Sequence, residues 1–431
     1  MTEPAQSQTH FLALAAGFAR TFALRFLVVY LIIYIVPFPF GTLPYTGWPA
    51  ELVENLKHWF VPLVGRAVFG VAITIFPGGS GDTTYNYVEV FCFALIALVI
   101  GLAWTVAVRG RPVSSRTLDV ARITVRYCLG ATMLGYGWDK VVPLQFPSPG
   151  PDRLLMAYGD SSPMGLLWTF MGASKAYVVF SGFLEVAGGL LILFRRTALL
   201  GGLLSAAVLT NILLMNLCYD VPVKLFSAHL LLMALFVVAP DAARLLNLFL
   251  LNAPVPAADL RVLRLERPWA RRGVAGAKLA FIFWVGLMPA YFHYQEFRGQ
   301  GTPGPAKPWT GVYRVESFIR DGVAERALPD DQRWVRVGIS STGLGVIVRA
   351  DGSGRRQSME FNESKGTVTI TRRGETNAIV LTFARCEPGV MLLQGQFEGA
   401  TVSAHLRLQD EARPLLTSRG FHWINEFPYN R

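Results

Sequence analysis

Long uninterrupted apolar runs are the feature that most limits what this chain can fold into. A helix needs roughly 20 consecutive, mostly apolar residues to cross the hydrocarbon core of a bilayer. Seven runs approach or reach that length: Phe22–Pro37, Tyr87–Val108, Val120–Tyr136, Tyr177–Phe194, Leu199–Leu217, Val221–Ala239 and Ala275–Phe292. Of the 431 residues, 52% are apolar and only 16% are charged, a balance typical of chains buried in lipid. The sequence therefore predicts a mainly α-helical polytopic membrane protein.

The net formal charge of +11 is concentrated in alternate loops between these runs. The arginine-rich loops contain Arg109, Arg111, Arg116 and Arg122, then Arg195 and Arg196, then Arg244, Arg261, Arg264, Arg267, Arg271 and Arg272. Such alternation follows the positive-inside rule. It predicts a multi-pass protein of the bacterial plasma (inner) membrane with a cytoplasmic N-terminus and everything after Phe292 outside. Because the basic residues follow the topology, we expect no nucleic-acid partner.

Cysteines and histidines show no spacing that is typical of a metal or redox site. The four cysteines are Cys92, Cys128, Cys218 and Cys386, and they form no C-x-x-C pair. Cys218 and Cys386 both fall on the predicted outer side, where pairing and free packing are both open. The six histidines are scattered, so we expect no metal site of known pattern.

Residues 1–115 are expected to form two spans joined by an outer loop. In this loop, ELVENLKHWFVPLV (Glu51–Val64) places its apolar side chains on one helical face, as in a segment lying in the membrane interface. Further along, FPGGSGDTTYNYVEVF offers Asp82 or Thr83 as the N-cap of the incoming helix.

Residues 116–245 contain four spans, and three stretches carry a family resemblance. They are RYCLGATMLGYGWDKVVP (126–143), SGFLEVAGGLLILF (181–194) and LCYDVPVKLFSAHLLLMALFVVAPDAARLLN (217–247). A helix that ends in a glycine followed shortly by lysine, and a glutamate followed by paired glycines, resemble the DoxX-like four-helix membrane bundle. The resemblance implies a long DoxX-like protein and an association with quinone-linked oxidation or membrane oxidoreductase assemblies. A shared fold does not by itself transfer an activity.

Glu185 lies in the middle of the fourth run, where a charge is costly and usually turned inward. At helical spacing it shares a face with Ser181, Gly188 and Gly189, small residues that allow a neighbouring helix to approach closely. The carboxylate is therefore expected to point into the bundle.

Other polar residues are expected at a similar depth, in the outer half of the bundle. Together with Glu185 they form a candidate ligand-binding column: Tyr136, Lys140, Glu185, Asn216, Lys224 and His229. Two interpretations are open. Glu185 pairs with a lysine, or accepts bonds from His229 and Asn216, to fix helix register. Alternatively, these groups surround a polar head group such as a quinone carbonyl, with His229 or Glu185 moving protons.

The end of the chain changes character. Residues 246–300 supply a basic cytoplasmic loop and the last span, and Gly301–Trp309 is a Pro/Gly linker. Residues 301–431 then show short alternating runs separated by turn signals such as RADGSG and FEGA. They predict an extracytoplasmic all-β barrel or sandwich of seven or eight strands, filled by its own side chains or holding a ligand. The aromatics Phe421, Trp423, Phe427 and Tyr429 are expected either to lie near the membrane or to close the barrel.

Two functions from different classes are consistent with this pattern. In the first, the bundle binds a quinone or another amphiphile, as a membrane component of an oxidoreductase system. No flavin, haem or iron–sulfur motif is present, so a redox role needs an oxidoreductase partner besides membrane lipids. In the second, the protein is a non-catalytic scaffold or assembly factor whose β domain binds a periplasmic protein.

Overall fold

The computed structural model describes residues 3–75, 78–258, 267–301, 307–372, 375, 377–409, 414–420, 422–423 and 426. These residues form two compact units. The helical unit comprises Met1–Val142 and Val179–Gln295, and the barrel unit comprises Pro143–Val178 and Glu296–Arg431. Each unit is thus built from two separate stretches of sequence. The sequence-based division at 115, 245 and 300 groups the chain differently, because it follows the chain in order.

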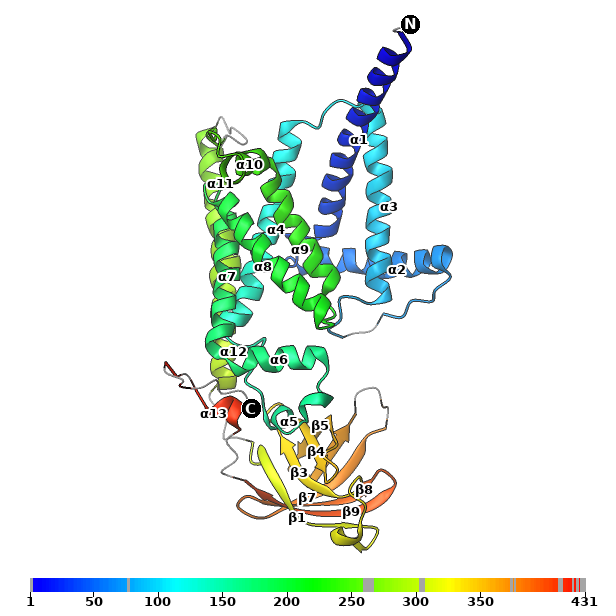
Figure 1. Cartoon of the computed structure of the whole chain (residues 1–431), viewed down its shortest axis with the longest axis vertical. Coiled ribbons are helices and arrows are strands. Elements are labelled where there is room, and N and C mark those ends of the chain that lie inside the picture. Colours follow the sequence, from blue (N-terminus) through cyan, green and yellow to red (C-terminus); the bar gives the residue numbers. More distant parts are fainter. Residues whose placement is uncertain are drawn as a thin grey trace. The chain divides into compact units, whose positions relative to one another are not determined.

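The helical unit is built from α-helices (Figure 1), with short turns between α7 and α8 and between α8 and α9. Its elements are α1 (Glu3–Ile35), α2 (Gly47–Phe69), α3 (Thr84–Ala107), α4 (Ser115–Val141), α7 (Lys175–Leu193), α8 (Ala198–Cys218), α9 (Lys224–Val238), η2 (Ala239–Asp241), α10 (Ala242–Phe249), α11 (Pro268–Ile282), the π-helical turn η3 (Phe283–Leu287) and α12 (Met288–Gly301). Helices α7 and α12 extend a few residues into the ranges of the barrel unit.

Six helical segments of the described chain are long and apolar enough to cross a membrane. They are Ala16–Ile35, Thr84–Ala107, Lys175–Leu193, Ala198–Cys218, Lys224–Phe249 and Pro268–Glu296. The protein is therefore a membrane-spanning helical chain, and six of the seven predicted runs lie in such helices.

The third predicted span, Val120–Tyr136, lies in α4, which is not among the six. Helix α4 has 27 residues, but Arg122 and Arg126 within the predicted span lower its apolar character. Its buried residues, among them Val125 and Leu129, belong to the same hydrophobic core as α1, α3, α7, α8 and α9. Packing against these neighbours, rather than hydropathy, stabilises α4 in the bundle.

Helix α2 confirms the helix predicted for Glu51–Val64 and exposes an apolar face. Leu52, Leu56 and Trp59 are each more than 60% exposed. Such a face is what an interfacial helix offers to lipid head groups.

The barrel unit contains a closed antiparallel barrel of eight strands. Its strands are β1 (Gly311–Arg320), β3 (Trp334–Ile339), β4 (Leu344–Arg349), β5 (Gly354–Asn362), β6 (Thr367–Thr371), β7 (Ile379–Glu387), β8 (Val390–Phe397) and β9 (Ala400–Leu408), with the short β2 (Val323–Ala324) beside β1. Consecutive strands pair and β1 pairs with β9, which closes the sheet (Figure 1). The interior is filled by side chains, among them Tyr313, Phe318, Trp334 and Phe397, each at most 2% exposed. Of the alternatives left open by the sequence, the structure shows a barrel of eight strands with a core of its own side chains.

Pro143–Val178 belongs to the barrel unit, whereas the sequence predicts Leu144–Phe170 within it as an outer loop between two spans of the bundle. It contains α5 (Pro151–Leu154), η1 (Tyr158–Asp160) and α6 (Pro163–Ala173). Helix α5 packs on β3 and β4, where a Cβ on Gly338 would lie 2.7 Å from the Pro151 carbonyl oxygen. The buried Asp152 carboxylate accepts a hydrogen bond of 2.6 Å from Arg356 Nε on β5. We refer to Pro143–Val178 as the clasp segment.

Two sequence predictions lie partly or wholly outside the described residues. The linker prediction covers residues 302–306, and the aromatic tail includes Phe421, Phe427 and Tyr429. Trp423 is described and is 91% exposed. All four cysteines are free, with Cys218 and Cys386 exposed.

Candidate functional site

Glu185 and Lys140 form a buried ion pair between α7 and α4. Lys140 Nζ lies 2.9 Å from both carboxylate oxygens of Glu185. Only 2% of Glu185 and 7% of Lys140 is exposed. The carboxylate does point into the bundle, and the structure gives it the lysine partner that the first interpretation requires.

Small residues make this pair possible. A Cβ on Gly182 would lie 2.7 Å from the Gly137 carbonyl oxygen, and one on Gly189 would lie 3.0 Å from that of Gly130. The backbones of α4 and α7 therefore touch along a glycine seam, as small residues permit in membrane helices. On the other side, a Cβ on Gly188 would lie 2.7 Å from Ser205 Oγ of α8.

Tyr136 lies one turn before Lys140 and borders the pair. The Lys140 ammonium is 3.4 Å from the Tyr136 carbonyl oxygen and 5.7 Å from the centre of its ring. The Tyr136 side chain itself is 42% exposed and its ring lies against Phe226 of α9. Lys140 is thus held by one carboxylate, one carbonyl and one aromatic face.

His229 is the centre of a second polar group, formed with two tyrosines of α1. Its Nε2 lies 2.6 Å from the Tyr30 hydroxyl, and its Nδ1 lies 2.6 Å from the Leu225 carbonyl oxygen. The Tyr34 ring stacks on the imidazole with centroids 3.9 Å apart and planes 2° apart. A carbonyl only accepts, so Nδ1 carries a proton; when the imidazole is neutral, Tyr30 is the donor to Nε2.

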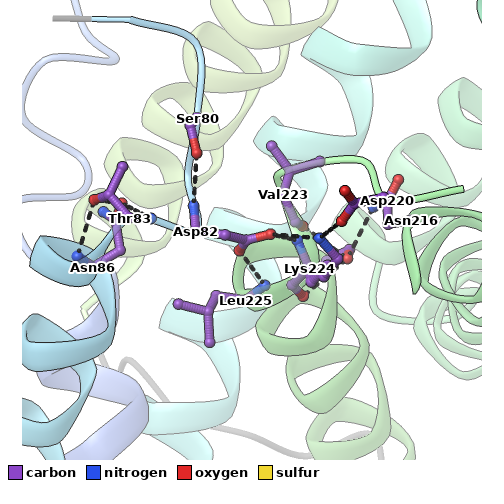
Figure 2. Close-up of polar contacts among 10 residues, drawn as sticks. Ser80, Asp82, Thr83, Asn86, Asn216, Asp220, Val223, Lys224 and Leu225 are labelled. Atoms are coloured by element: carbon purple, nitrogen blue, oxygen red, sulfur yellow. Dashed lines mark hydrogen bonds and ion pairs between the residues drawn. The ribbon is translucent and has the colours of Figure 1, made fainter. Parts of the chain in front are cut away.

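Lys224 belongs to a third group, which holds the start of α9 (Figure 2). Val223 occupies the N-cap of this helix and has no side-chain acceptor. Asp82, from the segment before α3, accepts instead from the backbone N–H groups of Lys224 (2.8 Å) and Leu225 (2.9 Å). The Lys224 ammonium pairs with Asp220 at 2.8 Å and lies 3.8 Å from Asp82.

Asp82 was expected to cap α3, together with Thr83 as the alternative. Thr83 caps α3 through a reciprocal capping box with Asn86. The Asp82 carboxylate caps α9 instead. There it is stabilised by two backbone N–H groups that have no partner within the helix and by the positive end of the helix dipole.

Asn216 completes the six predicted residues. Its amide donates to Ser227 Oγ at 3.1 Å, one turn beyond Lys224 on α9. Ser227 in turn donates to carbonyls of its own helix. Asn216 therefore ties the end of α8 to the beginning of α9.

The contacts thus divide the six predicted residues into three groups. Tyr136, Lys140 and Glu185 form the first, His229 is the one predicted residue in the second, and Asn216 and Lys224 lie near each other in the third. Sequence reasoning missed Tyr30, Tyr34 and Asp82. The two tyrosines are four residues apart in VVYLIIYIV, so one helical face carries both hydroxyls. That spacing was a usable signal, whereas nothing local links Asp82 to a helix that begins 142 residues later.

Two further observations concern possible cofactors. Among the described residues, no group of three His, Cys, Asp or Glu side chains converges as metal ligands would. A quinone needs hydrogen-bond donors to its carbonyl oxygens and an apolar wall for its ring. Tyr30 carries a hydroxyl and Tyr34 an aromatic ring, which are the group types that such a head group would use, and in this structure both contact His229.

Six apolar helices, polar groups buried between them and a closed antiparallel barrel define a polytopic membrane protein with a β-barrel unit. No family model matches the chain, and no solved structure matches it. It is 34% identical over 126 residues to the uncharacterized protein YwoB of Bacillus subtilis (strain 168), a match that covers 29% of this chain and 80% of YwoB. The chain belongs to the same family as YwoB.

Proposed function

We propose that this protein is a DoxX-like component of a bacterial inner membrane that binds a quinone head group between α1 and α9, beside His229. In this proposal it serves an oxidoreductase system whose redox centres lie in a partner subunit. The N-terminus is cytoplasmic and the barrel unit is extracytoplasmic, in agreement with the alternating arginine-rich loops.

The observation that carries the proposal is the contact of Tyr30 and Tyr34 with a buried histidine. A neutral imidazole and a phenol joined by one hydrogen bond share a single proton, and either can donate it to a third acceptor. Because His229 is only 7% exposed, few water molecules compete for that proton.

Each residue then has a distinct role. The Leu225 carbonyl fixes the imidazole orientation, and the Tyr30 hydroxyl is the group that turns toward a quinone carbonyl. Tyr34 covers the imidazole face and limits the access of water. A bound quinone would supply the two-electron, two-proton chemistry, with the electrons coming from the partner subunit. This chain would supply the position of the head group and one of the two protons.

The ion pair of Glu185 with Lys140 has a structural role in this proposal. Both charges satisfy each other within the helical unit. A head group at His229 therefore does not need the Glu185 carboxylate, and we separate the two groups experimentally.

Mass spectrometry of small molecules that co-purify with the detergent-solubilised protein tests the proposal. We expect a quinone in the wild-type sample and a loss of most of it in Tyr30→Phe, which removes the donor and keeps the ring. The matched control is Tyr219→Phe, which changes a partly exposed tyrosine at the end of α8. A wild-type protein free of quinone, or equal quinone content in Tyr30→Phe, would contradict quinone binding at this site.

A second candidate is a scaffold whose barrel unit binds a periplasmic protein, and one surface favours it. A pocket at one end of the barrel is lined by Arg349, Arg355, Arg372, Gln357 and Glu398, with further residues of the same strands. Glu398 accepts hydrogen bonds from both Arg349 and Arg372. Since the interior is filled, a partner would have to use such an outer surface.

The two candidates differ in what the barrel surface does. A scaffold role predicts that Arg355→Glu abolishes cross-linking of the barrel unit to a neighbouring protein and leaves the quinone content unchanged. If cross-links are the same in wild type and Arg355→Glu, the pocket is not the partner surface.

A further inference from the structure

Four basic side chains converge at one end of the helical unit. They come from the first half of α4, from the turn between α7 and α8, and from α11: Arg122, Arg126, Arg195 and Lys278. Arg122 and Arg126 are one turn apart on α4. A Cβ on Gly130, in the next turn of α4, would lie 2.7 Å from Leu193 Cδ2, two residues before Arg195, and the Lys278 ammonium lies over the ring of Phe194, the residue before Arg195. We refer to these four residues as the basic cluster.

Arg126 is the most buried member and its bonding is incomplete. Its side chain is 9% exposed, and its guanidinium lies over the ring of Tyr127, 5.6 Å from the ring centre. Its Nε is buried and has no hydrogen-bond acceptor. A buried guanidinium N–H without an acceptor is destabilising, so an acceptor is expected when the protein is in its membrane.

Arg195 shows the same deficit, and Lys278 has an aromatic ring as its neighbour. Arg195 Nη2 is buried without an acceptor. The Lys278 ammonium lies over the ring of Phe194, 4.9 Å from its centre. Among the described acidic side chains, none forms an ion pair with Arg126, Arg195 or Lys278, so this part of the cluster has no counter-charge of its own.

Asp241 does not fill this role. Its carboxylate accepts from Arg122 Nη2 at 3.0 Å and from Arg244 Nη1 at 2.5 Å. Arg122 Nε also donates to the Val237 carbonyl oxygen. One carboxylate shared by two arginines at the end of α9 leaves the other three cations unmatched.

We propose that the basic cluster is a binding site for the phosphate group of an anionic phospholipid. Guanidinium groups bind phosphate oxygens with two parallel N–H donors, and basic pockets between membrane helices are known hosts of anionic head groups. Phe194, which supports Lys278, is 43% exposed, so an apolar surface for an acyl chain adjoins the cations. A free phosphate ion would gain nothing from this ring.

The site does not depend on quinone binding. Its residues belong to α4, α11 and the α7–α8 turn, whereas Tyr30 and His229 belong to α1 and α9. Failure of either proposal therefore leaves the other standing.

The test uses the full chain in detergent, stripped of lipid, and titrated with phosphatidylglycerol or phosphatidylcholine while adducts are counted by native mass spectrometry. Each cation near an anionic head group changes affinity about fivefold. The double variant Arg195→Gln/Lys278→Gln should therefore bind phosphatidylglycerol about 25-fold more weakly than wild type. The control Arg271→Gln/Arg272→Gln removes two exposed charges from the start of α11 and should bind as wild type does.

Three outcomes decide the proposal. Equal affinity for the two lipids, or equal phosphatidylglycerol affinity in wild type and the Arg195→Gln/Lys278→Gln variant, would overturn it. Thermal stabilisation by inorganic phosphate as large as that by phosphatidylglycerol would assign the site to a free anion instead of a lipid. If Arg126→Gln fails to fold, the Arg195→Gln/Lys278→Gln variant still decides, because both of its positions are partly exposed.

Discussion

Replacing one partner of the ion pair of Lys140 and Glu185 should greatly lower the free energy of unfolding, whereas replacing both partners should hardly change it. Lys140→Met leaves the Glu185 carboxylate without its cation in a place where it is 2% exposed. Removal of one partner of a buried pair typically costs about 3–5 kcal/mol, because the remaining charge is left uncompensated. We expect Lys140→Met to lie in this range.

The double variant Lys140→Met/Glu185→Leu should lose no more than about 1 kcal/mol, since apolar side chains of similar volume often replace a buried pair without loss. Glu185→Leu alone leaves the Lys140 ammonium uncompensated and should also cost about 3–5 kcal/mol. The sum of the single variants then exceeds the loss in the double variant by about 5 kcal/mol or more, which is the coupling between the two residues. Glu185→Gln keeps a hydrogen-bond acceptor for Lys140 and should cost about 1–3 kcal/mol.

Reversible unfolding of the detergent-solubilised protein, followed by circular dichroism, measures these free energies. Lys175→Met is a matched control, because this lysine lies exposed at the first position of α7. Additive losses in the double variant would refute the account of a mutually compensated pair. Quinone content measured on the same samples should stay constant while the free energy of unfolding changes. If Glu185→Gln instead has normal stability and no bound ligand, the carboxylate takes part in ligand binding.

Three further predictions concern a cap, the topology and the barrel. Asp82→Ala should destabilise the helical unit by about 1–2 kcal/mol through loss of the α9 cap, as seen in unfolding of the same detergent sample; unchanged stability would show that the two N–H groups find other acceptors. A reporter active only outside the cytoplasm should work when fused after Phe292 and fail near Arg264, and the reverse result would contradict the orientation. Partial burial would raise the pKa of Glu398, but the hydrogen bond from Arg372 and the charges of Arg349 and Arg372 outweigh it and hold the pKa below the usual value of 4.5. The stability gained from Glu398 should therefore be present near neutral pH and lost as pH falls below about 4.5, whereas Glu398→Gln should show a flatter pH profile of thermal unfolding.

The parts predicted well from the sequence are those governed by periodicity. Long apolar runs gave the six membrane-capable helices, and alternation gave most barrel strands. The inward direction of Glu185 followed from the small residues on its face, because only one arrangement satisfies both helix packing and a buried charge. Its partner Lys140 was one of several candidates, and only the glycine contact at Gly137 and Gly182 decides between them.

The parts that could not be predicted depend on contacts between distant segments. Strand β5 carries Arg355, Arg356 and Glu360, so its apolar alternation is weak, and only pairing with β4 and β6 makes it a strand. The cap of α9 by Asp82 and the contact of Tyr30 with His229 join residues more than 140 positions apart. Hydropathy also undervalued α4, whose Arg122 and Lys140 find their carboxylate partners only in the folded bundle.

The clasp segment changes what a single break in the chain can do. The polypeptide passes from one unit to the other after Val142, after Val178 and again after Gln295. We therefore expect that a protease that cuts only within residues 302–306 does not release the barrel, because α5 and the salt bridge of Asp152 with Arg356 join the two pieces. Before such a cut these contacts form within one molecule, where the covalent connections keep the local concentration of the partner high. The cut protein would then be a two-chain complex, and such a complex should also assemble from separately made fragments. A barrel produced without residues 143–178 lacks part of its own surface.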